Sequence, residues 1–535
     1  MAPRSHASSP AQDDSSALNE RERAAHLLAR LAYGPRPGET KRLIAMGVEK
    51  WLEDQLQEQD SHDPRLKTWL SEYQTLGLSV KECAEFTYTQ RVDKKTPSQE
   101  EQRAERIKRR IPLDEVVWST ALRAVYSDRQ ATEVMAEFWR NHLNVSFTKG
   151  QNIYSMVPDY ERSVIRDQVW GSFPAMLVAS ATHPAMLTYL DNHLSRRPPS
   201  KQELKEIERQ TERKTGSKER AVEAVQIATQ RGLNENYARE LLELHTLGVD
   251  NFYAQNDVIA LAEILTGWTI EGGRKGSQAF HFNAAMHVPG DIKLLGKRFA
   301  EDKEKGPGQG MEVLAMLGAH KGTADFIAMK MVRFLVADVP PASLVKEVAK
   351  TYRTSKGNLT AMLRTIVDSE EFWSRKNFRT KFKTPYEFII SALRVTGAEI
   401  DRQASIGNYL AEMGQPIYHC DDPTGYYDTA DAWLDPGVMA LRWQFATDLA
   451  LGKVRGVKIP ETFFDQIPYD APPRLWEHHL TTLILPGGAG PRTRAALATV
   501  TSEYLDQKGK RVPNLNQIGP TLVGLLLGSP EFQQQ

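Results

Sequence analysis

The stretch that most constrains the fold is residues 233–270, LNENYARELLELHTLGVDNFYAQNDVIALAEILTGWTI, which is typical of two helices joined by a short turn. Asn234 is placed to cap the first helix, because its side-chain oxygen can accept hydrogen bonds from the unpaired N–H groups of the first turn. Gly248 suits the left-handed position just past a helix end. We therefore predict one helix over residues 235–247 and a second that ends at Gly267.

The first helix of this pair is apolar over most of its circumference when drawn at about 100° per residue. Only Arg239, Glu243 and Thr246 lie toward a polar side. Glu240 and His245 are therefore predicted to point into protein, on different sides of the helix. A buried carboxylate needs a cation, a metal, hydrogen-bond donors or a proton, since leaving it unpaired costs several kcal/mol.

Helical periodicity, with apolar residues at i, i+3 and i+4, recurs through most of the chain. The predicted fold class is mainly α, a large multi-helix bundle or α/α-toroid-like domain with long loops and little β structure. Residues 281–296 alternate weakly and are expected to form a hairpin or an ordered loop. The phrases DSEEFWS near residue 370 and GSPEFQ near residue 530 resemble each other, and each ends a helical segment.

Composition and charge runs divide the chain. Residues 1–18 are small and polar and are predicted to be disordered. We predict a main helical domain over residues 19–375 that carries a charged surface insertion at 195–224. A C-terminal helical part follows over residues 376–535 and includes an aromatic loop at 413–437.

Bulk properties exclude several classes of function. The 68 basic and 68 acidic residues cancel, so net charge gives no reason to expect binding to nucleic acid or to an anionic membrane surface. No run approaches the about 18 apolar residues of a transmembrane segment. Cys83 and Cys420 lie far apart in the sequence and predict neither a disulfide framework nor a cysteine metal site. We expect no cofactor.

Several segments resemble one known family. The run from Asn234 to Asp250, followed by Leu265–Thr269, closely resembles the signature of a bacterial family catalogued as domain of unknown function 1800. The Phe-Trp-x-Asn-His motif that ends at His142, the segment 183–192 and the ending GLLLGSPEFQQQ resemble it too, so the resemblance covers nearly the whole chain. It implies a large, mainly helical bacterial protein, often exported, and it implies no biochemical activity.

Location follows from the start of the sequence and from this resemblance. Residues 1–18 contain no apolar signal-peptide core, so the protein is either cytoplasmic or exported with its leader removed. The resemblance favours a periplasmic or secreted protein.

The candidate catalytic residues come from the hub hairpin, residues 233–270, and from the family-like motifs, because no complete catalytic signature is present. Glu240 and Glu243 are three residues apart and so share a side of one helix. Glu240, Glu243, His142 and Asp191 are predicted to be catalytic. In the family pattern an Asp follows the position of His287, but this chain has Val288 there.

The aromatic loop is predicted to line one side of a substrate-binding site. Its tyrosines and Trp433 alternate with acidic residues, a pattern that suits sugars, since ring faces stack on sugar rings and acids accept hydrogen bonds from hydroxyl groups. Tyr426 and Tyr427 replace the Trp-Pro that the family pattern has here. The predicted substrate-binding residues are Trp139, Asn141, His183, Asn192, His287, Tyr418, Tyr426, Tyr427 and Trp433.

Three hypotheses of function remain open. The leading one is an exported hydrolase or lyase that cleaves an extracellular polysaccharide by carboxylate general acid/base chemistry. The second is a non-catalytic envelope or assembly protein, in which Glu240 is structural and paired with Arg394 or Arg442 and the aromatic loop contacts a partner protein. The third is a helical metalloenzyme that uses Glu240, Glu243 and histidines as ligands.

Overall fold

The computed structural model describes residues 17–57, 63–88, 97–230, 232–249, 251–272, 278–401, 404–465, 467–468, 471–506 and 515–535. Residues 1–16, most of the segment predicted to be disordered, lie outside this set, whereas Leu18 is buried.

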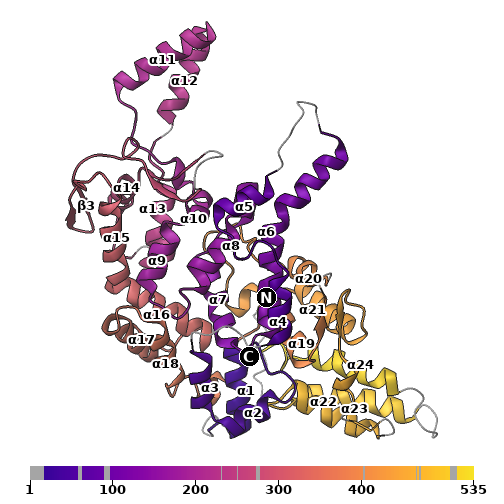
Figure 1. The fold of residues 1–535 in the computed structure, drawn as a ribbon. Helices are drawn as coiled ribbons and strands as arrows, with labels where there is room; N and C mark the ends of the chain where they lie inside the picture. The colour runs from indigo at the N-terminus through magenta and orange to yellow at the C-terminus, as the bar shows by residue number, and fades with distance from the viewer. Residues whose placement is uncertain are drawn as a thin grey trace, which may run out of the picture.

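The described residues are mainly helical (Figure 1), as predicted. The α-helices are α1 Glu20–Leu31, α2 Glu39–Met46, α3 Val48–Gln55, α4 Pro64–Ser71, α5 Val80–Thr87, α6 Gln99–Tyr126, α7 Gln130–His142, α8 Val157–Asp159, α9 Phe173–Ala181, α10 Pro184–Tyr189, α11 Lys201–Thr215, α12 Lys218–Gln230, α13 Glu235–Glu240, α14 Gln255–Ile264, α15 Gly308–Ala319, α16 Lys321–Leu335, α17 Ala342–Thr354, α18 Leu359–Val367, α19 Pro385–Val395, α20 Ile406–Glu412, α21 Pro436–Ala450, α22 Pro473–Ile484, α23 Pro491–Asp506 and α24 Leu515–Leu527. Shorter 3₁₀ and π segments are η1 Phe147–Lys149, η2 Gln151–Ser155, η3 Tyr160–Arg166, η4 Asn192–Leu194, η5 Leu241–Thr246, η6 Arg375–Asn377, η7 Ala430–Ala432 and η8 Glu461–Phe463.

The strands are short and form three antiparallel pairs in the described part of the chain. The pairs are β1 Trp268–Ile270 with β2 Phe280–Phe282, β3 Ile292–Leu294 with β4 Lys297–Phe299, and β5 Glu399–Ile400 with β6 Val457–Lys458. The hairpin of β3 and β4 begins inside residues 281–296, where non-helical structure was predicted.

One hydrophobic cluster runs from Ala24 to Phe532 and includes residues on both sides of position 375. Trp139 and Trp268 are among its largest fully buried side chains. The division at residues 375 and 376 remains a prediction. No helix among the described residues combines the length and apolar character that a membrane crossing requires.

The hub hairpin has the predicted caps but not the predicted helix. The Asn234 side chain accepts from Asn236 N at 2.9 Å, and Gly248 has a φ of 86°. After Glu240 the α-helix widens into the π-helical segment η5, in which Leu247 N donates to the carbonyl five residues earlier at 2.7 Å. A helical wheel drawn at about 100° per residue therefore gives the wrong side-chain directions beyond Glu240. Thr246, expected on a polar side, is fully buried and donates to Leu241 O at 2.7 Å.

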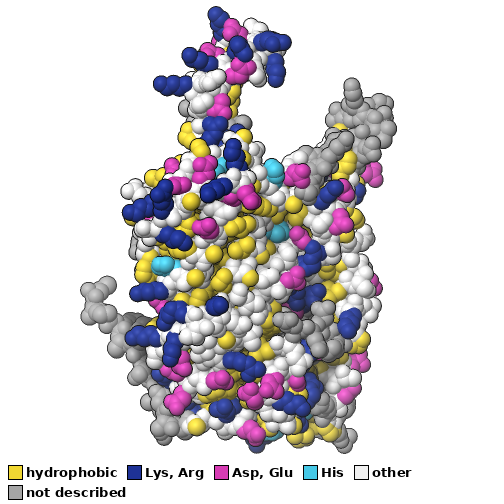
Figure 2. All heavy atoms as spheres, turned by 60° about the vertical axis from the view of Figure 1, so that its left-hand side comes forward, with side chains coloured by type: hydrophobic (Ala, Val, Ile, Leu, Met, Phe, Trp, Pro, Cys, Tyr) yellow, Lys and Arg dark blue, Asp and Glu magenta, His cyan; other side chains and the backbone are white. Residues whose placement is uncertain are grey.

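The charged insertion forms the helical pair α11 and α12, which projects from the body of the molecule (Figure 1). Acidic and basic side chains are interleaved over this projection (Figure 2). A capping box at Ser200 and Glu203 starts α11 by satisfying N–H groups of its first turn.

The two similar phrases near residues 370 and 530 form the same turn. The Ser369 hydroxyl donates to the carbonyl three residues back at 2.7 Å and accepts from the N–H three residues ahead at 3.2 Å. Ser529 makes the same two bonds, at 2.7 and 3.3 Å. The likeness in sequence therefore reflects one local structure used after α18 and again after α24.

Candidate functional site

A cavity of about 220 Å³ lies where α7, η5, α16, the start of α19 and the aromatic loop meet. Its polar lining includes Glu137, Asn141, His142, Glu243, Lys330, Arg333, Thr384, Glu387, Gln415, Thr424, Tyr426, Tyr427 and Asp428. Three segments singled out from the sequence thus converge here: the Phe-Trp-x-Asn-His motif, the hub hairpin and the aromatic loop.

His142 and Lys330 form a contact in the wall of this cavity. Lys330 Nζ lies 3.0 Å from His142 Nδ1, and His142 Nε2 lies 3.2 Å from the carbonyl oxygen of His245. A carbonyl can only accept, so Nε2 carries the proton and Nδ1 accepts from the ammonium. Burial first, and then the charge of Lys330, holds the pKa of His142 well below its ordinary value. Burial lowers the pKa of Lys330 to about 8.

Glu137 belongs to a buried chain of charges. Arg140 forms an ion pair with Glu137 and donates two hydrogen bonds of 2.9 Å to Glu161, which also accepts from Tyr418 Oη at 2.6 Å. Burial raises the pKa of Glu137, although the charge of Arg140 opposes that shift. A raised pKa is the direction of shift that suits a general acid.

Of the two candidate glutamates in the hub hairpin, Glu243 is the one that lines the cavity. Its side chain is 20% exposed, and Arg239 Nη1 lies 3.5 Å from it. Glu240 is half-buried and does not line the cavity. Burial, then the charges of Glu243 and Asp422, raise the pKa of Glu240. The charge of Glu243 therefore acts on Glu240, as their spacing predicted, but only Glu243 lines the cavity.

Asn141 fixes the aromatic loop to α7. Its Nδ2 donates to Tyr426 O and its Oδ1 accepts from Tyr426 N, both at 2.7 Å. Gly425 has a φ of 78°, and a Cβ there would collide with the backbone oxygen of Asn141. Trp433 Nε1 donates to Tyr427 O at 2.8 Å, which holds the loop from the other side.

Asn141→Ala is expected to lower the free energy of unfolding by about 1–3 kcal/mol, because two backbone groups of the loop lose their partners. Urea denaturation followed by circular dichroism measures the loss. Asn408→Ala is the matched control, since Asn408 is exposed on α20 and surface changes usually stay within about 0.5 kcal/mol. Equal denaturation midpoints for the two variants would contradict the role given to Asn141.

A larger cavity of about 600 Å³ lies beside α6 and the first half of α7. Four arginines line it, namely Arg123, Arg129, Arg162 and Arg166. Its buried glutamates are already occupied, since Arg166 donates two hydrogen bonds of 2.9 Å to Glu133, and Glu161 is bound by Arg140. We therefore place the candidate site in the smaller cavity, where the Phe-Trp-x-Asn-His motif, the hub hairpin and the aromatic loop converge.

Comparison with known families decides the relationship. The model of a family described as "Protein of unknown function (DUF1800)" matches residues 26–534, nearly the whole chain. The chain belongs to the DUF1800 family. Comparisons with curated proteins and with solved structures find no match. Because the family description assigns no activity, function in this DUF1800 protein has to be argued from its own site.

The structure of this DUF1800 protein brings five of the predicted site residues to the cavity: Asn141, His142, Glu243, Tyr426 and Tyr427. Tyr418 and Trp433 are not among its lining residues. Tyr418 donates to Glu161, and Trp433 holds the backbone of the aromatic loop.

Other predicted residues lie elsewhere and have structural partners. Asp191 is exposed and forms an ion pair with Lys149. Trp139 is fully buried in the core. His183 caps α10 by accepting from Ala185 N at 3.1 Å.

Asn192 and His287 contact the C-terminal end of the hub hairpin. Asn192 Nδ2 donates to the carbonyls of Leu265 and Trp268, at 3.2 and 3.1 Å. His287 Nδ1 lies 2.9 Å from Thr266 O. These two side chains support β1, and a substrate role for either remains a prediction.

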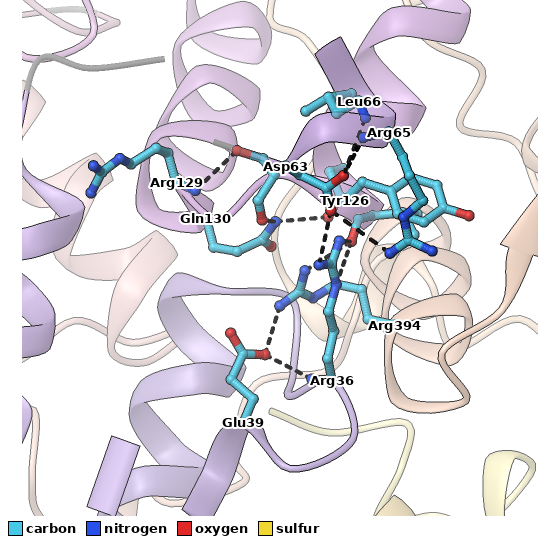
Figure 3. A network of polar contacts seen from close by, with 12 residues as sticks. Arg36, Glu39, Asp63, Arg65, Leu66, Tyr126, Arg129, Gln130 and Arg394 are labelled. Atoms are coloured by element: carbon cyan, nitrogen blue, oxygen red, sulfur yellow. Dashed lines mark hydrogen bonds and ion pairs between the residues drawn. The ribbon is translucent and has the colours of Figure 1, made fainter. Parts of the chain in front are cut away.

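The suggested partners of Glu240 were wrong. Arg394 instead donates to the carbonyls of Gly34 and Val125. It also pairs with Glu39 at 3.0 Å, and Figure 3 shows this contact. Arg442 donates to Lys383 O and Gln533 Oε1. Within the described ranges, no three His, Cys, Asp or Glu side chains are grouped to hold a metal ion.

Sequence reasoning missed Glu137, Lys330 and Arg333. Glu137 lies one turn before Asn141 in the same motif, so helical spacing could have found it. Lys330 lies between Met329 and Met331 in an otherwise apolar segment, and this break in the apolar pattern is its only local signal.

Proposed function

We propose that this protein is an enzyme that cleaves a glycan by general acid/base chemistry, acting in the periplasm or outside the cell. The observation that carries the proposal is the cavity itself, which groups Glu137 and Glu243 with the aromatic side chains of Tyr426 and Tyr427. Glycoside hydrolysis needs one carboxyl group that protonates the leaving oxygen and a second that acts as base or nucleophile.

The two glutamates differ in the way this chemistry requires. Glu137 has a pKa raised by burial, which suits the general acid. Glu243 is partly exposed to the cavity, where it can meet a water molecule or a sugar carbon. The tyrosine faces supply the stacking surface that sugar rings favour. At about 220 Å³, the space is small for a ligand pocket, so we propose that it encloses a single sugar unit.

A lyase reaction is the second candidate, and Lys330 is the observation that favours it. An amine with a pKa of about 8 can remove a proton near neutral pH. The neutral ring of His142 holds that amine in the cavity wall. Elimination leaves a carbon–carbon double bond in the product, whereas hydrolysis does not, so ultraviolet absorbance of the product separates the two reactions.

The proposal is tested by incubating the full chain with a panel of neutral and acidic polysaccharides and measuring new reducing ends. Cleavage of at least one polymer is expected. If every polymer stays intact, the enzyme proposal fails and the non-catalytic envelope or assembly protein becomes the better hypothesis. Fractionation of the bacterial cell checks the location, and recovery in the cytoplasm alone would refute export.

A further inference from the structure

Lys330 and Arg333 lie one turn apart on α16 and both line the cavity. We infer that they form a subsite for a carboxylate, so that the substrate is an acidic glycan built from uronate units. The inference rests on the proposed function and names its substrate class.

Neither cation has a carboxylate partner in the described part of the chain. The polar contact of Lys330 Nζ is His142 Nδ1 at 3.0 Å, and its other neighbour is the Phe326 ring at 5.6 Å. Arg333 makes no hydrogen bond or ion pair with the described residues, and its Nε is shielded from water without a partner. Leaving a hydrogen bond of a charged group unmade is unfavourable, and an incoming anion would supply the missing partner.

The acids of the cavity are mostly occupied by other groups. Glu137 pairs with Arg140, and Arg239 lies 3.5 Å from Glu243. Glu387 accepts from Thr384 N at 2.8 Å and from Gln535 Nε2 at 2.7 Å. These ion pairs and hydrogen bonds give the three carboxylates partners other than Lys330 and Arg333.

Asp428 is the remaining acid of the lining. Its charge raises the pKa of Lys330, yet it forms no ion pair with Lys330 or Arg333 within the described residues. Lys330 and Arg333 therefore lie one turn apart on the α16 wall of the cavity, and neither forms an ion pair with a described residue. A neutral sugar would leave both charges unpaired.

The geometry of the pair fits a carboxylate. His142 Nδ1 takes one of the three N–H groups of Lys330 and leaves the other two for a ligand. The guanidinium of Arg333 offers a planar fork that matches the two oxygens of a carboxylate. His142 is neutral because it is buried beside Lys330, so it adds no competing charge.

Binding of an acidic sugar should weaken as pH rises through about 8, where Lys330 loses its proton. The groups around Lys330 are His142 on α7, His245 on η5, Arg333 on α16 and Asp428 on the loop. Both histidines have pKa values far below this range, and arginine keeps its charge. Lys330 is therefore the group expected to titrate.

Isothermal titration calorimetry on the full chain tests the inference with oligogalacturonate, oligoglucuronate and their carboxyl-reduced, neutral counterparts. At pH 7 the better acidic ligand is expected to bind at least about 10-fold more tightly than its reduced form, since the reduced form cannot make the charged hydrogen bonds. Lys330→Gln and Arg333→Gln should each remove most of that preference. Arg333→Lys should restore part of it.

Lys346→Gln is the charge-matched control, because Lys346 is exposed on α17, and its binding should equal that of wild type. Lys330→Gln should also abolish the change in affinity near pH 8. Thermal melting checks that each variant is folded. Arg333 has no hydrogen bond or ion pair with the described residues, so Arg333→Gln should not lower the melting temperature. Lys330→Gln removes the donor to His142 Nδ1, so a small fall is expected there.

The results separate this inference from the proposed function. Equal affinity for acidic and reduced ligands, no binding of any of them, or binding that both Gln variants leave unchanged would overturn the carboxylate subsite. Cleavage of neutral polysaccharides without preference for acidic ones would also overturn it while leaving the enzyme proposal intact. Cation-dependent binding of a uronate without cleavage of any polymer would support the subsite and refute the enzyme.

Discussion

Arg140→Met is expected to lower the free energy of unfolding by about 3–5 kcal/mol, the usual cost of removing one partner from a buried ion pair. Arg140 is 5% exposed and pairs with Glu137 and Glu161. Methionine fills similar space but leaves Glu137 without its cation and Glu161 with Arg166 alone, at 3.9 Å. Urea denaturation measures the change, provided that the dependence of the unfolding free energy on urea has the same slope in wild type and variant.

The control is Arg110→Met on α6, where the pair with Asp114 has side chains that are 55% and 47% exposed. Exposed pairs contribute about 0–1 kcal/mol, so this variant should unfold close to wild type. A similar loss in both variants would mean that the effect comes from the methionine and not from the buried charges.

The pH dependence of the Arg140 variant gives an independent check. Burial alone would raise the pKa of Glu161, but Arg140 and Arg166 hold it below the ordinary value. In wild type this carboxylate therefore contributes stability above its unfolded-state pKa, and that contribution is lost as pH falls through the lower folded-state pKa. Without Arg140 the stabilisation is reduced, so the difference between variant and wild type should shrink in acid. A difference that stays constant would contradict this account.

What the sequence predicts well is local. The caps at Asn234 and Gly248 depend on residues within one turn, and both are found where predicted. The predominance of helices follows in the same way from periodicity that each segment carries by itself.

The sequence fails where distant segments decide the structure. The π-helical turn after Glu240 shifts every later side chain, and it buries Thr246 where a regular helix would expose it. Lys330 meets His142 across 188 positions, and Asn141 meets Tyr426 across 285. No local pattern contains these pairings, so the cavity could be predicted only as a convergence of motifs and not as a set of contacts.

Polar residues within the motifs were ambiguous for a related reason. Helix capping, backbone support and catalysis all use Asp, Asn and His side chains. His183 and Asn192 satisfy backbone groups, whereas Asn141 holds a loop at the cavity. Only the three-dimensional position distinguishes these uses.

Glu243→Gln is expected to reduce kcat on the cleaved polysaccharide by about 10²–10⁴-fold, the usual contribution of a general acid or base. Glu240→Gln, three residues earlier on the same side, should change kcat far less. The difference follows from position, because Glu243 lines the cavity and Glu240 lies outside it, near Asp422. Both substitutions keep the side-chain shape and remove one charge, so each is the control for the other.

The effect of Glu240→Gln on stability should differ from its effect on activity. Burial and the charges of Glu243 and Asp422 raise the pKa of Glu240, so its ionised form is less favourable in the folded than in the unfolded chain. At pH 7 a neutral glutamine side chain at this position avoids that penalty, and the melting temperature of Glu240→Gln should equal or exceed that of wild type. Equal losses of kcat in the two variants would remove the distinction between the glutamates, and full activity of Glu243→Gln would exclude it as the catalytic carboxylate.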